Sequence, residues 1–189
     1  MEKKFEKLLG ENRIISAVKN LKDLDRVLQE SSKIIFLLCG DICNLEETTR
    51  KIKSAGKTAF VHMDMIAGIS GKDTVAVDYI RENSFAEGVI TTKVNIAKYA
   101  KNRGMMVIQR CFLIDSLSFE NTKKILHECE FDAVEILPGV MPKIIKKLSE
   151  EIDTPLIAGG LISDIEDIEI ALNSGAIAVS TTKIDIGKK

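Results

Sequence analysis

His62 and Asp64 stand two residues apart, at the end of an apolar run that begins at Thr58. Residues two apart in a β-strand lie on one face, so both side chains are expected to point into one pocket, opposite Met63. A His–Asp pair can transfer protons, bind the hydroxyl groups of a ligand, or close a structural hydrogen-bond network. We expect one of the last two roles, because no clear catalytic motif accompanies the pair.

Three further charges interrupt or end apolar runs. Lys93 follows "ITT", Arg110 ends "MVIQR" and Glu135 lies inside "AVEIL". A charge in a buried strand is costly unless it is paired, and these residues come from successive predicted strands, so mutual pairing is expected. Either a structural ion-pair network or a polar floor for a small, hydroxylated, anionic ligand fits the pattern. Asp41 and Asp115 are weaker candidates that also fit a turn or a helix cap.

Glycines and hydroxyl residues end the last two apolar runs. Gly159 and Gly160 end "PLIAGG", and Ser180 and Thr181 end "IAVST". Glycine lets a ligand approach the backbone closely. If the chain is a (β/α)8 barrel, these residues end its last two strands, where backbone N–H groups and hydroxyls bind phosphate in many such barrels. We therefore predict a phosphate site at Gly159, Gly160, Ser180 and Thr181; a tight turn without a ligand is the alternative.

The elements that must position these residues recur along the whole chain. Each apolar run ends in a turn signal, and the first seven are followed by a helical pattern of apolar residues. The runs begin near Ile14, Ile34, Thr58, Val89, Met105, Ala133, Leu156 and Ile177.

The runs are nearly continuous rather than alternating, which is typical of parallel strands covered on both faces. Eight strand–helix repeats predict a compact (β/α)8 TIM-type barrel that spans residues 1–189 as a single domain. The alternative is a doubly wound sheet of five or six strands, in which the short runs at Val89 and Ile177 would not be strands. In a barrel, the carboxyl ends of the strands carry the functional residues.

Helix boundaries are also marked. Asn44 with Glu47, and Ser163 with Glu166, resemble capping boxes at helix starts. Three glycines stand where a helix should stop before the next strand, and these are Gly56, Gly104 and Gly175.

The composition limits the possible function classes. The net charge is -1, so no general excess of Lys and Arg attracts a polyanion, although a local basic patch is compatible with this balance. The Lys residues between 143 and 147 are typical of a solvated helix face. Four cysteines and two histidines show no zinc spacing, and no metal or cofactor is expected. No apolar stretch approaches a membrane span, so we expect a soluble, cytoplasmic protein.

Several strings together resemble one protein family. They are "FLLCGDICNL", "VHMDMIAGIS", "RCFLIDS", "VEILPGVMPKII", "PLIAGGLIS" and "AIAVSTT". In this order they resemble the glycerol-3-phosphate-responsive antiterminators (GlpP), over about residues 10–183. "AGGLI" alone would not be specific, because many phosphate-binding barrels carry something similar.

The resemblance implies a small TIM barrel that senses glycerol 3-phosphate and binds the leader of a glycerol-utilisation mRNA, preventing early termination of transcription. It implies an effector pocket at the charged residues and the phosphate positions named above. One departure is the ending "KIDIGKK" without Trp, where family members tend to have a more apolar close. This ending is expected to leave the outer face of the last strand less covered.

The alternative function is an isomerase- or aldolase-type enzyme acting on a small phosphorylated polyol or sugar, with Lys93 as a Schiff-base lysine.

Overall fold

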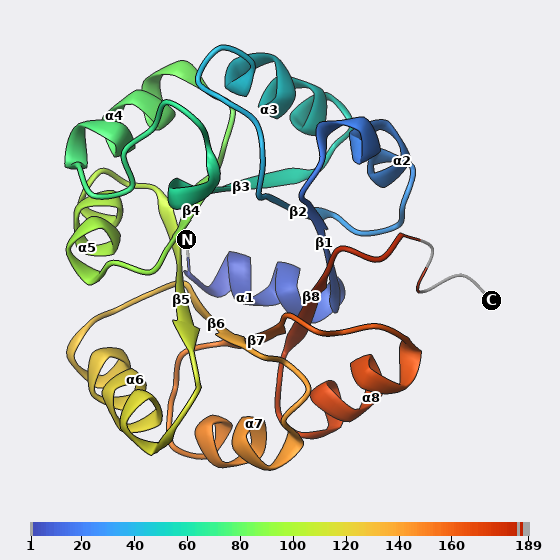
Figure 1. The fold of residues 1–189 in the computed structure, drawn as a ribbon, viewed down its shortest axis with the longest axis vertical. Coiled ribbons are helices and arrows are strands. Elements are labelled where there is room, and N and C mark those ends of the chain that lie inside the picture. The colour runs from blue at the N-terminus through green and yellow to red at the C-terminus, as the bar shows by residue number, and fades with distance from the viewer. Residues whose placement is uncertain (1, 185, 187–189) are drawn as a thin grey trace.

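The computed structural model describes residues 2–184 and 186. In this part of the chain, eight parallel strands form a closed ring and helices surround it (Figure 1). The strands are β1 (Ile14–Val18), β2 (Ile34–Leu37), β3 (Thr58–His62), β4 (Gly88–Thr91), β5 (Met106–Phe112), β6 (Ala133–Leu137), β7 (Leu156–Gly159) and β8 (Ala178–Thr181). The α-helices are α1 (Glu2–Glu11), α2 (Leu24–Leu28), α3 (Leu45–Ser54), α4 (Thr74–Asn83), α5 (Val94–Asn102), α6 (Ser116–Glu128), α7 (Pro142–Ser149) and α8 (Ile165–Asn173), and two 3-10 helices, η1 (Leu21–Asp23) and η2 (Met63–Met65), complete the set.

The predicted (β/α)8 barrel is confirmed. Each strand begins within one residue of the start that its apolar run predicted. The ring closes where β1 pairs with β8, with Ile14 opposite Val179. The doubly wound alternative is excluded, because the short runs at Val89 and Ile177 form β4 and β8 within the ring.

Two apolar cores hold the barrel together. The larger lies between the outer faces of the strands and the helices, where Val61, Val107 and Ile136 are fully buried. The smaller fills the inside of the ring, where Phe36, Phe60 and other inward side chains pack together. This division explains the continuous apolar runs, because both faces of each strand are covered.

Helix α1 closes the amino-terminal end of the ring. Phe5 and Leu9 belong to the inner core and are almost completely buried. The ring of Phe5 lies 5.0 Å from the ring of Phe60, measured between centroids. Figure 1 shows α1 crossing behind the opening of the barrel. Only the carboxyl-terminal end of the ring therefore remains for a site.

The glycine signals for helix ends are confirmed, and the capping signals are partly wrong. The three glycines have positive φ, and these are Gly56, Gly104 and Gly175. Asn44 does stand at the N-cap of α3, but its side chain bonds to Asp41 instead of to the helix. The N-cap of α8 is Asp164, one residue after the predicted Ser163, and its carboxylate accepts the N–H of Asp167 at 2.9 Å.

The segment after β8 contains no helix within the described residues. The expectation that the outer face of β8 is poorly covered is nevertheless wrong, because Val179 is fully buried and Thr181 nearly so. Ile184 and Ile186 pack against the outer core and supply part of this cover. Lys188 and Lys189 lie outside the described residues.

Candidate functional site

Polar side chains form the uppermost layer inside the ring. His62, Arg110, Glu135 and Ser180 each stand two positions after an apolar residue of the inner core, and Gly159 does the same on β7. Residues two apart share a strand face, so these positions look into the carboxyl-terminal end of the barrel. The mouth, as we name this layer together with Asp64 and Lys93 above it, is the candidate site.

A buried ion pair crosses between β5 and β6. Arg110 Nε lies 2.6 Å from Glu135 Oε2, and both side chains are almost fully buried. The hydroxyl of Ser180 donates to the other carboxylate oxygen, Glu135 Oε1, at 2.5 Å. Glu135 therefore has a partner on both oxygens, which offsets the cost of burying its charge.

Gly159 makes room for this contact. A Cβ atom at Gly159 would lie 2.5 Å from Glu135 Oε1 and equally close to Ser180 Oγ. The space that the sequence assigned to a phosphate beside this glycine is thus filled by two side chains of the protein. Gly160 has φ +76, and its carbonyl accepts the N–H of Gly139 at 3.0 Å. Each glycine has a structural reason, and phosphate binding at these positions stays a prediction.

Ser180 and Thr181 have different surroundings. They are successive residues of β8, so Ser180 faces the mouth and Thr181 faces the outer core. Thr181 Oγ1 donates to the carbonyl of Ile162 at 3.2 Å and accepts the N–H of Lys183 at 3.1 Å. Thr181 therefore ties the loop after β7 to the segment after β8.

His62 is a neutral imidazole at neutral pH. It is 3% exposed, and burial is the main cause that lowers its pKa to about 4. The positive charge of Arg110 lowers this pKa further, while Asp64 opposes the effect. Nδ1 of His62 accepts the backbone N–H of Asp64 at 3.2 Å, so Nε2 carries the ring proton. His62 is thus held as a donor at Nε2, suited to an oxygen of a ligand.

The expected position of Asp64 and the expected partner of Lys93 are corrected. Strand β3 ends at His62, and Asp64 lies in the turn η2 instead of on the strand. The ammonium of Lys93 pairs with Asp64, about 30% exposed like itself, and not with the buried Arg110–Glu135 pair. Lys93 is the residue before α5, beyond the end of β4, so its side chain reaches across the top of the ring instead of into it.

Two loops beside the mouth are joined, which the sequence did not predict. The loop after β2 and the loop after β3 form a bridge between Asp41 and Ala67, and Ala67 N–H donates to the carbonyl of Gly40 at 3.0 Å. A Cβ atom at Gly71 would lie 2.3 Å from Asp64 Oδ1. The segment 64–73 therefore packs directly on the carboxylate that holds Lys93, and glycine at position 71 was the available signal.

The two weaker candidates are local structural residues. The carboxylate of Asp41 accepts the N–H groups of Cys43 and Asn44, which makes a turn. Asp115 caps α6 and accepts the N–H of Ser118 at 2.7 Å.

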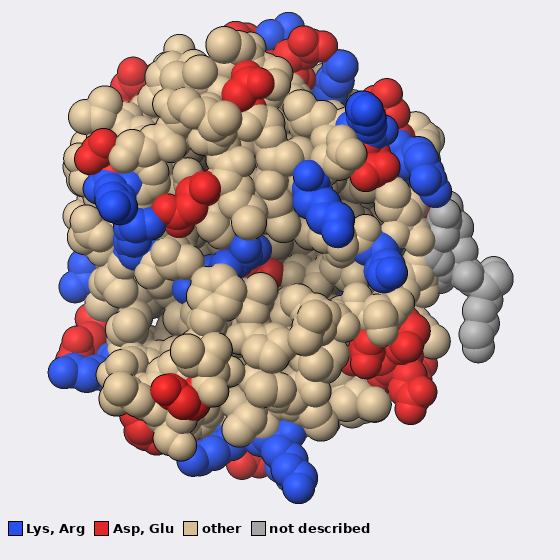
Figure 2. Space-filling view, in the orientation of Figure 1, with Lys and Arg blue, Asp and Glu red and all other residues tan. Residues whose placement is uncertain are grey.

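The charges of the mouth are balanced. Two cations, Lys93 and Arg110, each pair with one carboxylate, and His62 is neutral. Figure 2 shows a central hollow on this face with basic and acidic atoms at its floor, and further Lys and Arg side chains around its edge. Lys19 and Lys183 follow β1 and β8 and are exposed. Among the described residues, no three His, Cys, Asp or Glu side chains gather as a metal site would require.

Comparison with known families identifies the chain's relatives. The family model described as glycerol-3-phosphate responsive antiterminator matches residues 14–186, which include every residue of the mouth. The chain belongs to this family.

Three known proteins are similar to this chain over nearly their full lengths. The glycerol uptake operon antiterminator regulatory protein of Listeria monocytogenes is 30% identical, with a TM-score of 0.87, over 93% of this chain and 94% of that one. An antiterminator-related protein of Thermotoga maritima is 28% identical, with a TM-score of 0.81, over 94% and 99%. YgcP of Escherichia coli K12, described as uncharacterized, is 40% identical over 179 residues, which are 95% of this chain and 93% of YgcP.

Likeness to enzymes extends to the fold alone. A deoxyribose phosphate aldolase from Aeropyrum pernix has a TM-score of 0.72 but only 16% identity. Barrels host many unrelated functions, so this likeness says nothing about chemistry. No helix in the described part of the chain has the length and apolar character to cross a bilayer.

Proposed function

We propose that this chain is a regulator that binds glycerol 3-phosphate at the mouth and then binds an mRNA leader, so that transcription continues past an early terminator. Membership of the antiterminator family carries the proposal. The name of the Listeria relative places that protein at the glycerol uptake operon, which agrees with it. The polar layer inside the barrel supplies the chemistry, because a phosphorylated polyol needs cations and hydrogen-bond groups close together.

The phosphate is expected to compete with Asp64 for Lys93. Both cations of the mouth are already paired, so a dianion must displace a carboxylate to gain a cation. The Arg110–Glu135 pair is buried, and removing one partner would leave an uncompensated charge at a cost of about 3–5 kcal/mol. The Lys93–Asp64 pair is part-exposed and worth about 1 kcal/mol or less. Lys93 is therefore the cation that changes partner.

Release of Asp64 offers a route from effector to regulation. Asp64 is in contact with Gly71 and lies at the start of the segment 64–73. Ala67 in this segment is bridged to Asp41 in the neighbouring loop. A change of partner at Lys93 would therefore shift the population of two loop conformations on the face that surrounds the mouth.

Contact with RNA rests on the family and on local charge. The net charge of -1 gives no general attraction to a polyanion. Lys19 and Lys183 are exposed beside the mouth, just after the neighbouring strands β1 and β8, and are suited to phosphates of the leader. Such contacts position a nucleic acid and make its affinity fall with salt.

Calorimetric titration with glycerol 3-phosphate tests the effector site, with glycerol and inorganic phosphate as reference ligands. Lys93→Met is expected to weaken binding by about 10- to 100-fold, as loss of a charged hydrogen bond does. Asp64→Asn is expected to tighten binding, because it removes the competing carboxylate. Lys98→Met, at an exposed lysine of α5, is the matched control and should bind like the wild type.

A leader-binding assay tests the regulatory step. RNA affinity should rise when glycerol 3-phosphate is added and should fall with increasing salt. An RNA affinity that is the same with and without effector would show that the regulatory proposal is wrong, even if the effector binds.

The enzyme alternative has its own test, since Lys93 at the mouth is the lysine that would form a Schiff base. Borohydride reduction in the presence of a triose phosphate would trap an imine on Lys93. We expect no adduct and no turnover. A Lys93 adduct found by mass spectrometry would favour the enzyme instead.

A further inference from the structure

The segment from the end of β5 to the start of α6 exposes apolar side chains. Phe112 is 53% exposed, Ile114 is 83% exposed and Leu117 is 68% exposed. A single exposed apolar residue is ordinary, but three in one short segment form a patch of the kind that marks an interaction site. We call Ile114 and Leu117 the knob.

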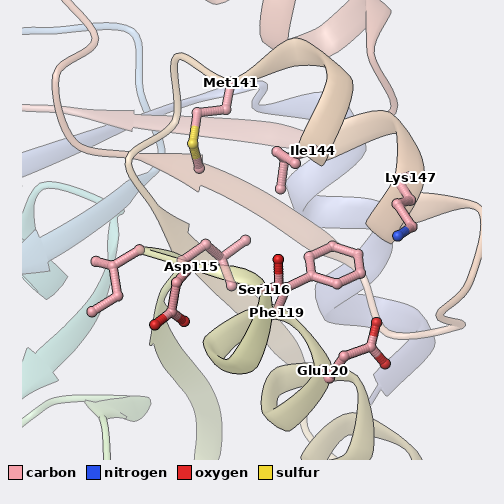
Figure 3. Close-up of a pocket in the computed structure, with 9 residues that line it drawn as sticks. Asp115, Ser116, Phe119, Glu120, Met141, Ile144 and Lys147 are labelled. Atoms are coloured by element: carbon pink, nitrogen blue, oxygen red, sulfur yellow. The ribbon is translucent and has the colours of Figure 1, made fainter.

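A cavity of about 320 Å³ lies beside the knob, between the starts of α6 and α7 (Figure 3). Its walls are mainly apolar and include Phe119, Met141 and Ile144, and Glu120 and Lys147 stand at its edge. In Figure 3, Met141 and Ile144 from α7 and the segment before it face Phe119 from α6 across the space. The cavity could therefore receive an apolar side chain of moderate size.

The turn that carries the knob is held in one conformation. Asp115 caps α6, and Ser118 Oγ accepts the N–H groups of Ile114 and Asp115 at 2.9 and 3.0 Å. The backbone under the exposed side chains is thus fixed by hydrogen bonds. A pre-organised apolar surface loses little conformational entropy on association.

We propose that this surface is a two-fold interface with a second copy of the chain, in which the knob of each copy enters the cavity of the other. A two-fold interface uses the same patch on both partners, so the patch must contain both halves of the contact. Knob and cavity lie side by side here, as that symmetry requires. The proposal is independent of the proposed function.

The charges at the edge favour a second copy over a different partner. Glu120 and Lys147 have opposite signs within one patch. Glu120 also forms a surface i,i+3 pair with Lys123 at 3.2 Å, which costs little to rearrange. A two-fold axis can bring Lys147 of each copy near Glu120 of the other, whereas a partner of uniform charge would be repelled by one of them. The cavity lies at the α6–α7 side of the outer ring, so the interface would leave the central opening free (Figure 1).

Sedimentation equilibrium over a wide concentration range tests the interface. The wild type is expected to show a dimer that dissociates on dilution. Ile114→Asp should weaken the dimer by at least about 30-fold, the effect of losing a central contact. Leu117→Asp repeats the test at the second knob residue, and circular dichroism verifies that both variants fold. Val75→Asp is the matched control, because Val75 is 72% exposed on α4, and its dimer should persist.

Charge exchange tests the two-fold arrangement. Glu120→Lys and Lys147→Glu should each weaken the dimer, and the double variant should recover it. A wild type that is monomeric at every concentration would overturn the proposal and assign the surface to a different partner. A dimer that survives Ile114→Asp and Leu117→Asp would overturn it as well, because the copies would then meet elsewhere.

Discussion

His62 shows how one buried residue makes the mouth sensitive to acid. Its pKa is lowered from 6.5 to about 4, chiefly by burial and then by Arg110. Between these values the unfolded chain binds a proton that folded His62 does not bind. The free energy of unfolding should therefore fall as the pH decreases through this window, by roughly 3 kcal/mol in total, and this contribution should level off below the lower value.

His62→Asn should remove this part of the pH dependence, because asparagine keeps an acceptor for the Asp64 N–H but does not titrate. Denaturant unfolding at a series of pH values would measure the difference between the two proteins. His127→Asn, the same substitution at the other histidine of the chain, is measured in parallel as the comparison variant. Parallel curves for the wild type and His62→Asn would contradict the assignment.

Gly159 is the residue on which the buried network depends most directly. Gly159→Ala would place a Cβ 2.5 Å from Glu135 Oε1 and Ser180 Oγ. Relief requires the ion pair or the strand to move, so a loss of about 1–3 kcal/mol in the free energy of unfolding is expected. Thermal or denaturant unfolding would measure it. At Gly10 in helix α1, an added Cβ would meet no atom beyond its own stretch of helix within 4 Å. Gly10→Ala should therefore be neutral or slightly stabilising, by up to about 1 kcal/mol. Equal effects of the two substitutions would show that Gly159 is not constrained by its neighbours.

At the scale of elements, α1 is part of the inner core although it lies outside the strand–helix repeat. Phe5 is almost completely buried and packs on Phe60 at the end of the ring opposite the mouth. The helix therefore contributes to stability, and the distance between the two ends separates this contribution from ligand binding.

Phe5→Ala is expected to lower the free energy of unfolding by about 3–5 kcal/mol, since it opens a cavity in the inner core. The affinity for glycerol 3-phosphate should stay as in the wild type while the protein is folded. Denaturant unfolding and calorimetry measure the two quantities separately. Val75→Ala, at an exposed position, should change neither. A large loss of affinity with Phe5→Ala would show that the two ends are coupled.

At the scale of the whole molecule, one kind of hydrogen bond recurs along the amino-terminal rim of the barrel. A side chain just before β2, β4 and β6 accepts a backbone N–H from the preceding strand, the pairs being Ser32 with Ser16, Glu87 with Ala59 and Asp132 with Val107. These hydrogen bonds link neighbouring strands at the end of the barrel where no ligand is expected. One rim of the barrel thus serves stability, and the other carries the candidate site, as in other barrels of this type.

Asp132→Ala should test this division. Asp132 is buried, accepts the N–H of Val107 at 2.7 Å and pairs with Lys101 at 3.1 Å. Its loss leaves a buried donor without an acceptor, so the free energy of unfolding should fall by about 1–3 kcal/mol with effector affinity unchanged. Unfolding and titration of the same preparation would check both. Asp153→Ala, at an exposed aspartate near this rim, should have little effect on either.

The sequence predicted the barrel because the period of its apolar runs reports burial on both strand faces, which is a local property. It also predicted which strand ends are polar, because a polar residue that ends an apolar run is a local property as well. It did not predict the partner of Lys93, because Asp64 lies 29 residues away and the reach of a lysine side chain cannot be read from spacing. The role of Gly159 was missed likewise, since it depends on Glu135 and Ser180 meeting in space.

The amino-terminal helix has one more consequence. Because α1 covers the amino-terminal end of the ring and side chains fill its interior, a small ligand can reach and leave the mouth only from the carboxyl-terminal side. An RNA bound across this opening would slow the dissociation of an effector beneath it. It would thus lengthen the residence time of the effector without contacting it.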